Sequence, residues 1–183
     1  MVAPSFDSDA LEVLTKKPSL RLIKLKFEGL ENGYFYKFVP GGFLLQSQDV
    51  NHVEKYQLKI VTDHKPSQKE MNDLMFAFQL VKYVKSNAIL IAKEGKTIGI
   101  GAGQMSRVEA VEIALKKAGK FAEGAVLASD AFFPFKDSVE LAAKYKIKAI
   151  IQPGGSKRDQ ESIDCCNEHG LSMVMTGVRH FRH

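Results

Sequence analysis

The chain has 183 residues, of which 45% are hydrophobic and 26% charged, and its net charge is +5. This composition is typical of a folded globular protein and excludes a disordered chain. No apolar run approaches the roughly 20 residues that a membrane span needs, and the N-terminus lacks a signal-peptide pattern. The two cysteines, Cys165 and Cys166, are adjacent and poorly placed to pair with each other, as expected in a reducing compartment. We therefore expect a cytoplasmic protein without a membrane partner.

The positive charge admits several kinds of anionic partner. A nucleic acid, a nucleotide, or a phosphorylated or polyglutamylated small molecule would each suit a net charge of +5 and a pI near 9.1. The lysines are spread along the chain, and the sequence shows no recognisable nucleic-acid-binding module. We therefore expect a small anionic ligand and no nucleic acid.

The first third of the chain is its less regular part. Residues 8–16 are expected to form a short helix, and residues 20–27 and 55–62 alternate between polar and apolar as strands do. Two further short strands are expected on either side of Pro40 and the two glycines after it. This part is predicted to be an appendage of one main domain that begins near residue 66.

Helices and strands alternate from residue 66 onward. Ser67 and Ser106 are each followed three residues later by a glutamate, the spacing of a capping box, which predicts helices that run to about Lys85 and Ala118. Two further helices are expected at residues 137–145 and 159–169. Five strands are expected at residues 88–93, 96–101, 125–129, 148–152 and 171–176.

The resulting order, α-β-β-α-β-α-β-α-β, predicts an α/β domain. Short strands that alternate with helices imply a sheet covered on both faces, in which an antiparallel hairpin around Glu94-Gly95 precedes parallel strands. We therefore expect a three-layer α/β/α domain with a mixed sheet. Ligands of such sheets bind beyond the carboxyl ends of the strands, so the loops that follow the strands are the candidates for function.

The first candidate loop is IGIGAGQMSR, residues 98–107. Its three glycines would let backbone N–H groups approach an anion, and Ser106 and Arg107 stand at the positive end of the following helix. The motif is neither a dinucleotide-binding fingerprint nor a Walker loop. A glycine-rich turn needed only for packing is the alternative interpretation.

The second loop is ASDAFFPFKDS, residues 128–138. It places three phenylalanines and a proline between two aspartates: Asp130, Phe132, Phe133, Pro134, Phe135 and Asp137. At least one ring is expected in the core, whereas another could offer its face to a planar ligand near the strand end. The second aspartate is expected to cap the following helix, or to accept hydrogen bonds from a heterocyclic amine.

The third loop is QPGGSKRD, residues 152–159, where Ser156, Lys157 and Arg158 would offer donors and charge at a helix N-terminus, unless the segment is a plain turn. The C-terminal segment GVRHFRH places Arg179 and aromatic side chains just past the last strand, where the segment either frays or closes the same cleft. Because the three loops follow strands of one sheet, we predict that they share a cleft.

The sequence offers little for metal or covalent chemistry. His52-Val53-Glu54 matches the first half of the zinc-deaminase signature, but the P-C-x-x-C half is missing. The nucleophile elbow G-x-S-x-G is also missing. We therefore expect no zinc site.

The candidate loops and their order resemble one enzyme family. The segments that carry the resemblance are VKYVKSNAI, IGIGAGQMSR, ASDAFFPFKDS, QPGGSKRD and the terminal RHFRH. They resemble the C-terminal half of AICAR transformylase, the formyl-transfer module of a purine-biosynthetic bifunctional enzyme that in many organisms also carries IMP cyclohydrolase. The resemblance is specific over residues 66–183, and VAPSFDSDALEVLTKK near the start also looks like that family.

The resemblance implies a fold and a reaction. The family's module is similar to two cytidine-deaminase-like α/β/α subdomains in tandem, without the deaminase zinc. Residues 66–183 would be the C-terminal subdomain, and residues 1–65 the remainder of the preceding subdomain with a connector. The reaction would transfer the formyl group of 10-formyltetrahydrofolate to 5-aminoimidazole-4-carboxamide ribonucleotide (AICAR), giving FAICAR, in de novo purine biosynthesis.

The resemblance also implies binding residues. The nucleotide would be bound by Asn87, Arg107, Phe132 and Arg179. The folate site would comprise Val108, Pro134, Phe135, Asp137, Ser156 and Lys157. A monovalent cation such as K⁺ would lie near Ser86 and Asp130. The phenylalanine-rich loop would then separate two flat ligands, with Phe132 toward the nucleotide and Phe135 toward the pterin.

Proton transfer in the family is assigned to a Lys-His dipeptide that this sequence lacks. His64-Lys65 has the reverse order, so we assign no catalytic residue here and expect the chain to be inactive alone. The family forms its active sites across a homodimer, so the resemblance implies a homodimer or pairing with a separate first half of the module. The alternative is a non-catalytic binding or interaction module of the same fold.

Overall fold

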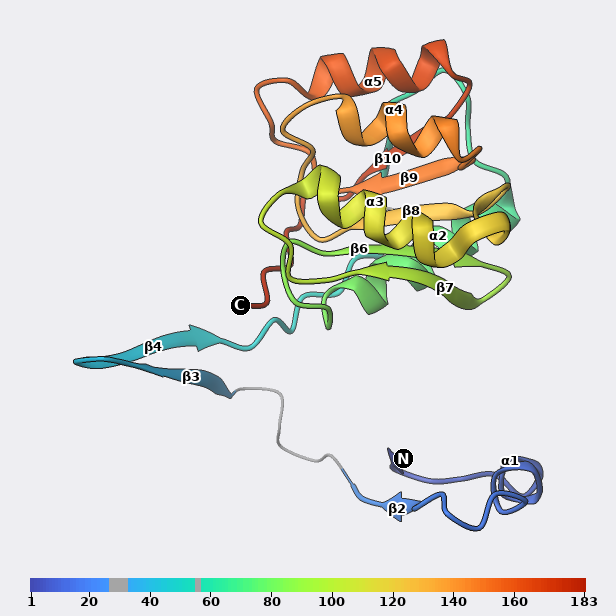
Figure 1. The fold of residues 1–183 in the computed structure, drawn as a ribbon, viewed down its shortest axis with the longest axis vertical. Helices are drawn as coiled ribbons and strands as arrows, with labels where there is room; N and C mark the ends of the chain where they lie inside the picture. Colours follow the sequence, from blue (N-terminus) through green and yellow to red (C-terminus); the bar gives the residue numbers. More distant parts are fainter. Residues whose placement is uncertain (27–32, 55–56) are drawn as a thin grey trace. The chain divides into compact units, whose positions relative to one another are not determined.

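The chain folds into two compact units, Met1–Val50 and Asn51–His183. The structure is a computed structural model that describes residues 1–26, 33–54 and 57–183 (Figure 1). The two units differ in their cores. Nearly all of the fully buried hydrophobic side chains lie in the second unit, which is therefore the part that can position a site.

The first unit contains short elements only. Strand β1 (Val2–Ala3) pairs in parallel with β2 (Ile23–Lys24), and α1 (Ser8–Leu14) lies between them in sequence. The helix α1 confirms the short helix expected near the start of the chain. The strand predicted over residues 20–27 is limited to β2 in the described part, and its last residue lies outside the described residues.

A hairpin of β3 (Tyr34–Val39) and β4 (Gly42–Ser47) completes the first unit. Pro40 and Gly41 form its turn, and Gly41 has a φ of 85°. Proline followed by a residue with positive φ is typical of a type II turn, which explains why this sequence reverses there. The strands predicted around the Pro-Gly-Gly segment are confirmed, although every residue of both strands is exposed.

The second unit is an α/β domain built on a sheet of order β5-β10-β9-β8-β6-β7. Strands β8, β9 and β10 are parallel, whereas β6 runs antiparallel to β7 and β8, and β5 antiparallel to β10. Its strands are β5 (Lys59–Ile60), β6 (Ile89–Lys93), β7 (Lys96–Gly101), β8 (Val126–Ser129), β9 (Ala149–Gln152) and β10 (Ser172–Met175). Its helices are α2 (Gln68–Val81), α3 (Arg107–Ala118), the 3-10 helix η2 (Gly119–Ala122), α4 (Asp137–Lys144) and α5 (Asp159–Glu168).

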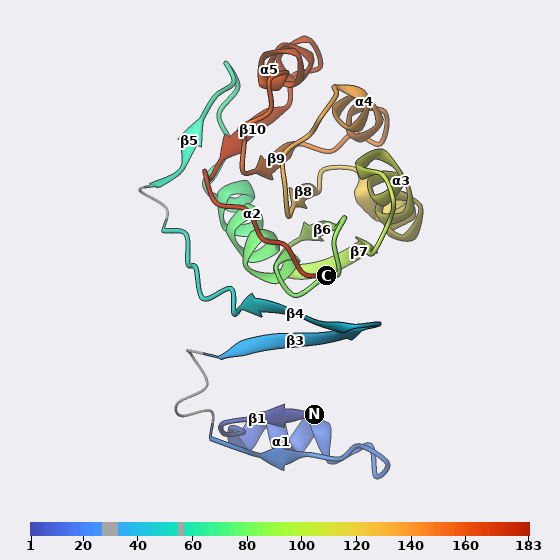
Figure 2. The ribbon, with the colours of Figure 1, turned by 90° about the vertical axis from the view of Figure 1, so that its left-hand side faces the viewer.

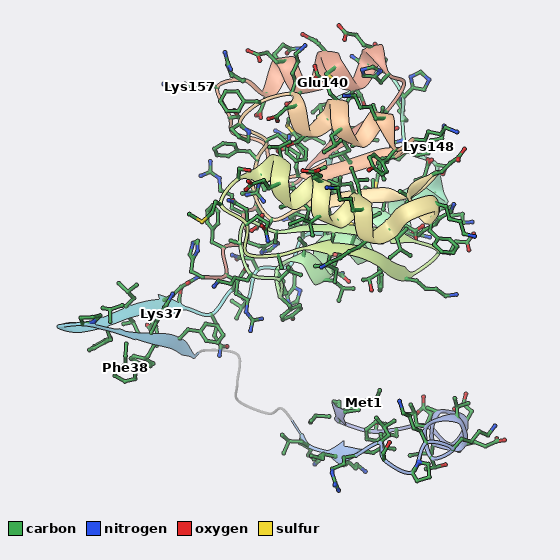
Figure 3. The ribbon with its side chains drawn as sticks, in the orientation of Figure 1. Met1, Lys37, Phe38, Glu140, Lys148 and Lys157 are labelled. Atoms are coloured by element: carbon green, nitrogen blue, oxygen red, sulfur yellow. The ribbon has the colours of Figure 1, made fainter. Side chains whose placement is uncertain are left out.

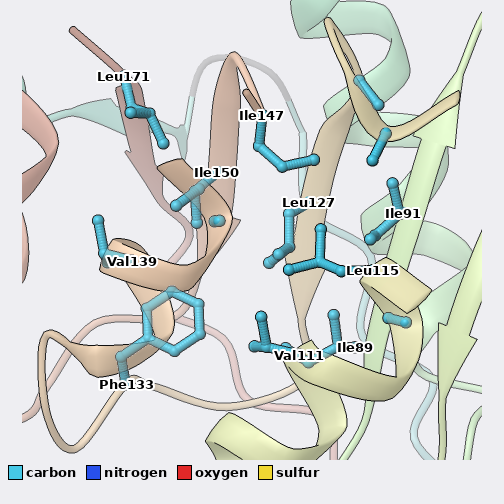
Figure 4. Close-up of a cluster of buried hydrophobic side chains, with 14 of the residues drawn as sticks. Ile89, Ile91, Val111, Leu115, Leu127, Phe133, Val139, Ile147, Ile150 and Leu171 are labelled. Atoms are coloured by element: carbon cyan, nitrogen blue, oxygen red, sulfur yellow. The ribbon is translucent and has the colours of Figure 1, made fainter. Parts of the chain in front are cut away.

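The helices cover both faces of this sheet. Figure 2 shows α2 on one face and α3, α4 and α5 on the other. Successive strand residues alternate between the two layers: Ile89 and Ile91 pack in the core under α3 (Figure 4), whereas Leu90 packs in the core under α2. The predicted three-layer α/β/α arrangement with a mixed sheet is therefore confirmed, and so is the predicted order of helices and strands from residue 66.

The boundary between the compact units falls before the one predicted at residue 65. The reason is β5, which pairs with β10 through Val174 opposite Ile60 and Met175 opposite Lys59. This pairing joins residues 59–60 to the sheet of the second unit. Local sequence pattern cannot reveal it, because the two strands are far apart along the chain. The strand predicted over residues 55–62 is shorter than expected, and residues 55–56 lie outside the described part.

Both predicted capping boxes are present. The Ser67 hydroxyl accepts a hydrogen bond from Glu70 N, and the Ser106 hydroxyl accepts one from Glu109 N, so α2 and α3 begin as expected. The helix α2 ends at Val81 rather than near Lys85. The predicted cap of α4 is wrong, because Asp137 is the first residue of that helix and Lys136 precedes it without a side-chain cap.

Two glycines of the glycine-rich loop are required by packing. A Cβ atom at Gly99 would lie 2.1 Å from Ala114 O, and one at Gly101 would lie 1.9 Å from Ala110 O. Strand β7 therefore approaches the backbone of α3 more closely than any other residue type would allow. For these two glycines the packing interpretation is correct, and only the segment from residue 102 to α3 faces the candidate site.

Candidate functional site

The candidate loops lie at one edge of the sheet. Ile89 at the start of β6 is opposite Gly101 at the end of β7 and opposite Ser129 at the end of β8. Strands β8, β9 and β10 are parallel, so the loops that follow them leave from this same edge. The segment before β6 and the loops after β7, β8, β9 and β10 therefore converge there, as the sequence predicted.

A hollow of about 450 Å³ lies at this edge, between the start of α3 and the start of α4. Its volume is within the range of small-molecule sites. It is lined by Asn87, Met105, Ser106, Arg107, Val108, Ala131, Phe132, Pro134, Phe135, Asp137 and Phe181. It thus brings together three of the residues predicted for the nucleotide and four of those predicted for the folate. Ser156, Lys157 and Arg179 are outside this lining.

The three phenylalanines of the loop after β8 have different environments. Phe133 is fully buried in the core beside Val139 (Figure 4). Phe132 is half-buried and Phe135 is 50% exposed, and both line the hollow. The expectation that at least one ring belongs to the core is therefore confirmed, while the other two offer aromatic faces at the hollow.

Arginines from two other loops cover these two rings. The Arg179 guanidinium, after β10, lies 5.0 Å from the centroid of the Phe132 ring, and the Arg158 guanidinium, after β9, lies 5.1 Å from that of Phe135. A Cβ atom at Gly155 would lie 3.1 Å from Arg179 Nη2, so the loops after β9 and β10 also approach each other. The loop that carries Ser156 and Lys157 therefore adjoins the hollow.

Arg107 has a buried guanidinium at the inner wall of the hollow. Only 7% of the residue is exposed, and Nη1 donates to a carboxylate oxygen of Asp130, which is fully buried, and to Ala88 O at 3.2 Å. Nη2 donates to Asn87 Oδ1 at 2.8 Å. Two of the three polar residues predicted for the nucleotide, Asn87 and Arg107, thus hold each other in place. The Asn87 amide nitrogen donates in turn to Gln104 O at 2.9 Å.

One donor of this buried group is unsatisfied. Arg107 Nε is buried and has no hydrogen-bond partner among the described residues. An unsatisfied buried donor costs free energy. Because this nitrogen is closed to solvent, a ligand atom could reach it only if the surrounding side chains moved.

Asp130 is the centre of the network, although the sequence indicated only that it lies near a strand end. One carboxylate oxygen also accepts from Ala88 N at 3.2 Å, and the other accepts from the Ser86 hydroxyl. Because Arg107 already balances the charge of this carboxylate, the geometry gives no independent support to a potassium ion between Ser86 and Asp130. Among the described residues, no group of three or more His, Cys, Asp or Glu side chains is placed to hold a metal.

The C-terminal segment is fixed to this network. Ser86 N donates to Arg182 O at 2.9 Å, Arg182 N donates to the Ser86 hydroxyl at 3.2 Å, and His180 N donates to Asp130 O at 2.9 Å. Phe181 contributes to the lining of the hollow. Of the two interpretations of this segment, closure of the cleft is therefore correct and fraying is wrong.

The two cysteines offer no reactive thiolate. Both belong to α5 and are buried in the core between this helix and the sheet. Desolvation raises the pKa of the Cys166 thiol to about 12 and also raises the pKa of Cys165. A thiol must ionise to act as a nucleophile. These residues are therefore core side chains.

No helix among residues 1–26, 33–54 and 57–183 is long and apolar enough to cross a membrane.

The structure is an α/β domain with a hollow of small-molecule size at the carboxyl edge of its parallel strands. Residues 1–117 match the family model described as the AICARFT/IMPCHase bienzyme, so the chain belongs to this family. The predicted family is confirmed, while the assignment to the C-terminal half of the transformylase module stays a prediction.

Curated relatives agree with this family. The bifunctional purine biosynthesis protein PurH of Oceanobacillus iheyensis is 56% identical over 185 residues, which cover 100% of this chain and 36% of the relative. PurH of Persephonella marina is 56% identical over 188 residues, and PurH of Aquifex aeolicus 50% over 186 residues, with the same shares covered. The chain thus spans 36% of the length of these relatives.

Similar solved structures are more distant. Acinetobacter baumannii RibD (form 1) is 17% identical with a TM-score of 0.45, and the match covers 60% of this chain and 35% of that chain. The dCMP deaminase of cyanophage S-TIM5 in its apo form is 16% identical with a TM-score of 0.41, and the match covers 60% of this chain and 98% of that chain.

Proposed function

We propose that this chain supplies part of the nucleotide and folate sites for the transfer of a formyl group from 10-formyltetrahydrofolate to AICAR in de novo purine biosynthesis. The observation that carries the proposal is the single hollow in which residues predicted for both ligands meet. Membership of a family whose curated relatives are named for purine biosynthesis supports it. The remaining length of those relatives would supply what this chain lacks.

The nucleotide would lie against Phe132. The flat imidazole can stack on this half-buried ring. The Arg179 guanidinium, which lies 5.0 Å from the ring centroid, can then pair with the phosphate of the stacked nucleotide. Arg107, which lines the hollow, would lie beside the carboxamide or ribose oxygens. Asn87 would act mainly by holding Arg107, since its Oδ1 accepts from that guanidinium.

The folate would lie against Phe135 and Pro134 on the other side of the same loop. The half-buried carboxylate of Asp137 at the start of α4 can accept hydrogen bonds from the amino and N–H groups of a pterin. Val108 lines the hollow at the start of α3, where backbone N–H groups favour an oxygen that gains negative charge. Ser156 and Lys157, which lie outside the lining of the hollow, would contact the end of the folate that projects from it.

The chemistry needs two ligands in contact and one proton removed. The AICAR amine attacks the formyl carbon, a C–N bond forms, the bond from that carbon to the folate nitrogen breaks, and the amine proton passes to a base while the folate nitrogen gains one. Holding both reactants in one hollow supplies the proximity that such a step requires. The Lys-His pair of the family is missing from these residues, so we propose that turnover requires further chain from the longer protein or from a partner.

Calorimetry with AICAR tests the nucleotide half of the proposal. We expect the Phe132→Ala and Arg179→Ala variants each to bind AICAR at least about tenfold more weakly than the wild-type chain, since each loses a stacking or charge-assisted contact. The Lys148→Ala variant, changed at the amino-terminal end of β9, should bind like the wild type. Equal affinities in all four proteins would contradict the proposal.

A second candidate function is a non-catalytic binding module of the same fold. The specific observation that favours it is the missing Lys-His pair. This alternative predicts AICAR binding without turnover in any assembly. Formyl transfer that appears when the chain is mixed with the remaining part of a PurH protein would exclude it.

A further inference from the structure

Arg158 lies near the hollow but belongs to neither the residues predicted for the nucleotide nor those predicted for the folate. The sequence pattern indicated a donor at a helix start, and the structure places its guanidinium 5.1 Å from the centroid of the Phe135 ring, at the rim of the hollow. Arg179 covers Phe132 in the same way, so each aromatic face of the loop after β8 has one arginine beside it. Two arginine–phenylalanine pairs from the loops after three neighbouring parallel strands therefore lie beside the hollow, which the two phenylalanines line.

The position of Arg158 is fixed while part of its guanidinium is open. Its Nε lies 3.2 Å from Glu161 Oε1, one turn further along α5, and the side chain is 51% exposed. The structure gives no ion pair or hydrogen bond to the two Nη atoms among its described residues. A guanidinium that is oriented by a ring and by one carboxylate can still accept a second carboxylate through its free N–H groups.

The stacked pair of Arg158 and Phe135 contributes little to the stability of the core. Phe135 is 50% exposed and Arg158 is exposed, so their stacking removes little apolar surface from water. The fully buried Phe133 already anchors the loop in the core. A cation held over an exposed ring at the mouth of a hollow is therefore better explained by a ligand that is aromatic at one end and anionic at the other.

We propose that Arg158 is a further binding residue, which pairs with the glutamate carboxylates of the folate. The inference rests on the proposed function and deepens it by assigning the anionic end of that ligand. Asp137 provides the acceptor for the pterin, Phe135 the aromatic wall, and Arg158 the cation for the carboxylates beyond it. Arg158 thereby selects folates that carry glutamate over pteroates that lack it.

The test compares folic acid with pteroic acid, which has the same pterin and ends in a single benzoate carboxylate in place of the glutamate and its two carboxylates. Both are titrated by calorimetry into the 183-residue chain and into its Arg158→Ala, Arg158→Lys and Lys148→Ala variants. Figure 3 shows Lys148 at the opposite end of the second unit from Lys157, the neighbour of Arg158, so Lys148→Ala removes the same charge far from the hollow.

We expect the Arg158→Ala variant to bind folic acid roughly tenfold more weakly, because one charge-assisted pair is lost. Its affinity for pteroic acid should fall by less, since only the one benzoate carboxylate remains there, Arg158→Lys should retain part of the difference, and Lys148→Ala should behave as the wild type. A loss in Arg158→Ala that is equal for the two ligands, or no loss for folic acid, would overturn the assignment of Arg158 while the folate site stands.

Two further outcomes keep the result interpretable. A wild-type chain that binds neither ligand would overturn the folate part of the proposed function, and this inference with it. The Arg158→Lys variant keeps the charge and the long side chain, so it still decides the matter if Arg158→Ala does not fold. In that case selectivity for folic acid over pteroic acid that Arg158→Lys retains in part or in full supports a charge contact, and loss of that selectivity contradicts it.

Discussion

The buried ion pair of Arg107 and Asp130 organises the candidate site at the level of single residues. The sequence placed Arg107 at a helix start and Asp130 near a strand end, and each prediction came from local pattern. Their contact joins residues that are 23 positions apart, so local pattern could not reveal it. The choice among the three phenylalanines also escaped prediction, because a loop has no periodicity to separate buried from exposed rings.

Removing one partner of this pair should destabilise the domain strongly. We expect Asp130→Ala to lower the free energy of unfolding by about 3–5 kcal/mol, because it leaves the Arg107 charge buried without a counter-ion. Urea denaturation monitored by circular dichroism measures the change. The double variant Asp130→Leu with Arg107→Met should recover part of the loss, since it removes the buried charge, while Ala88 N and the Ser86 hydroxyl still lose their acceptor. Full stability of the single variant would contradict this role.

At the level of elements, the sequence was most informative where structure is local. Both capping boxes and the hairpin around Glu94 and Gly95 are present, and these two residues have the positive φ values that a tight hairpin turn requires. Apart from the cap of α4, what the sequence did not settle is non-local. The pairing of β5 with β10 places the unit boundary before residue 65. For the C-terminal segment the sequence left fraying and closure open, and the hydrogen bonds to Ser86 favour closure.

Ser86 should fix the C-terminal segment to the site. Its Ser86→Ala variant keeps the backbone bond to Arg182 O but loses the hydroxyl that links Arg182 N to the Asp130 carboxylate. We expect hydrogen exchange at the Arg182 amide to become faster while the amides of β8 remain protected. AICAR affinity should fall by a few-fold, because Phe181 and Arg179 lose their support. Unchanged exchange at Arg182 would show that the hydroxyl does not hold the segment.

At the level of the whole molecule, the chain contains a candidate ligand site in one unit and an exposed hairpin in the other. The hairpin exposes Tyr34, Tyr36 and Phe38, which are 57%, 60% and 85% exposed, and the Phe38 side chain is visible in Figure 3. An isolated two-stranded hairpin is only marginally stable in water. This exposure is compatible with the homodimer or the pairing with further chain that the family resemblance implies, and the relatives are longer than the segment that matches here.

The central claim, that AICAR and a folate share the hollow at the carboxyl edge of the strands, is tested most directly by amide chemical-shift mapping of the chain with each ligand in turn. We predict that AICAR shifts the amides of Asn87, Phe132 and Arg179, and that folic acid added afterwards shifts those of Val108, Phe135 and Asp137. Shifts from either ligand that cluster outside this edge, or no shifts at saturating ligand, would contradict the claim.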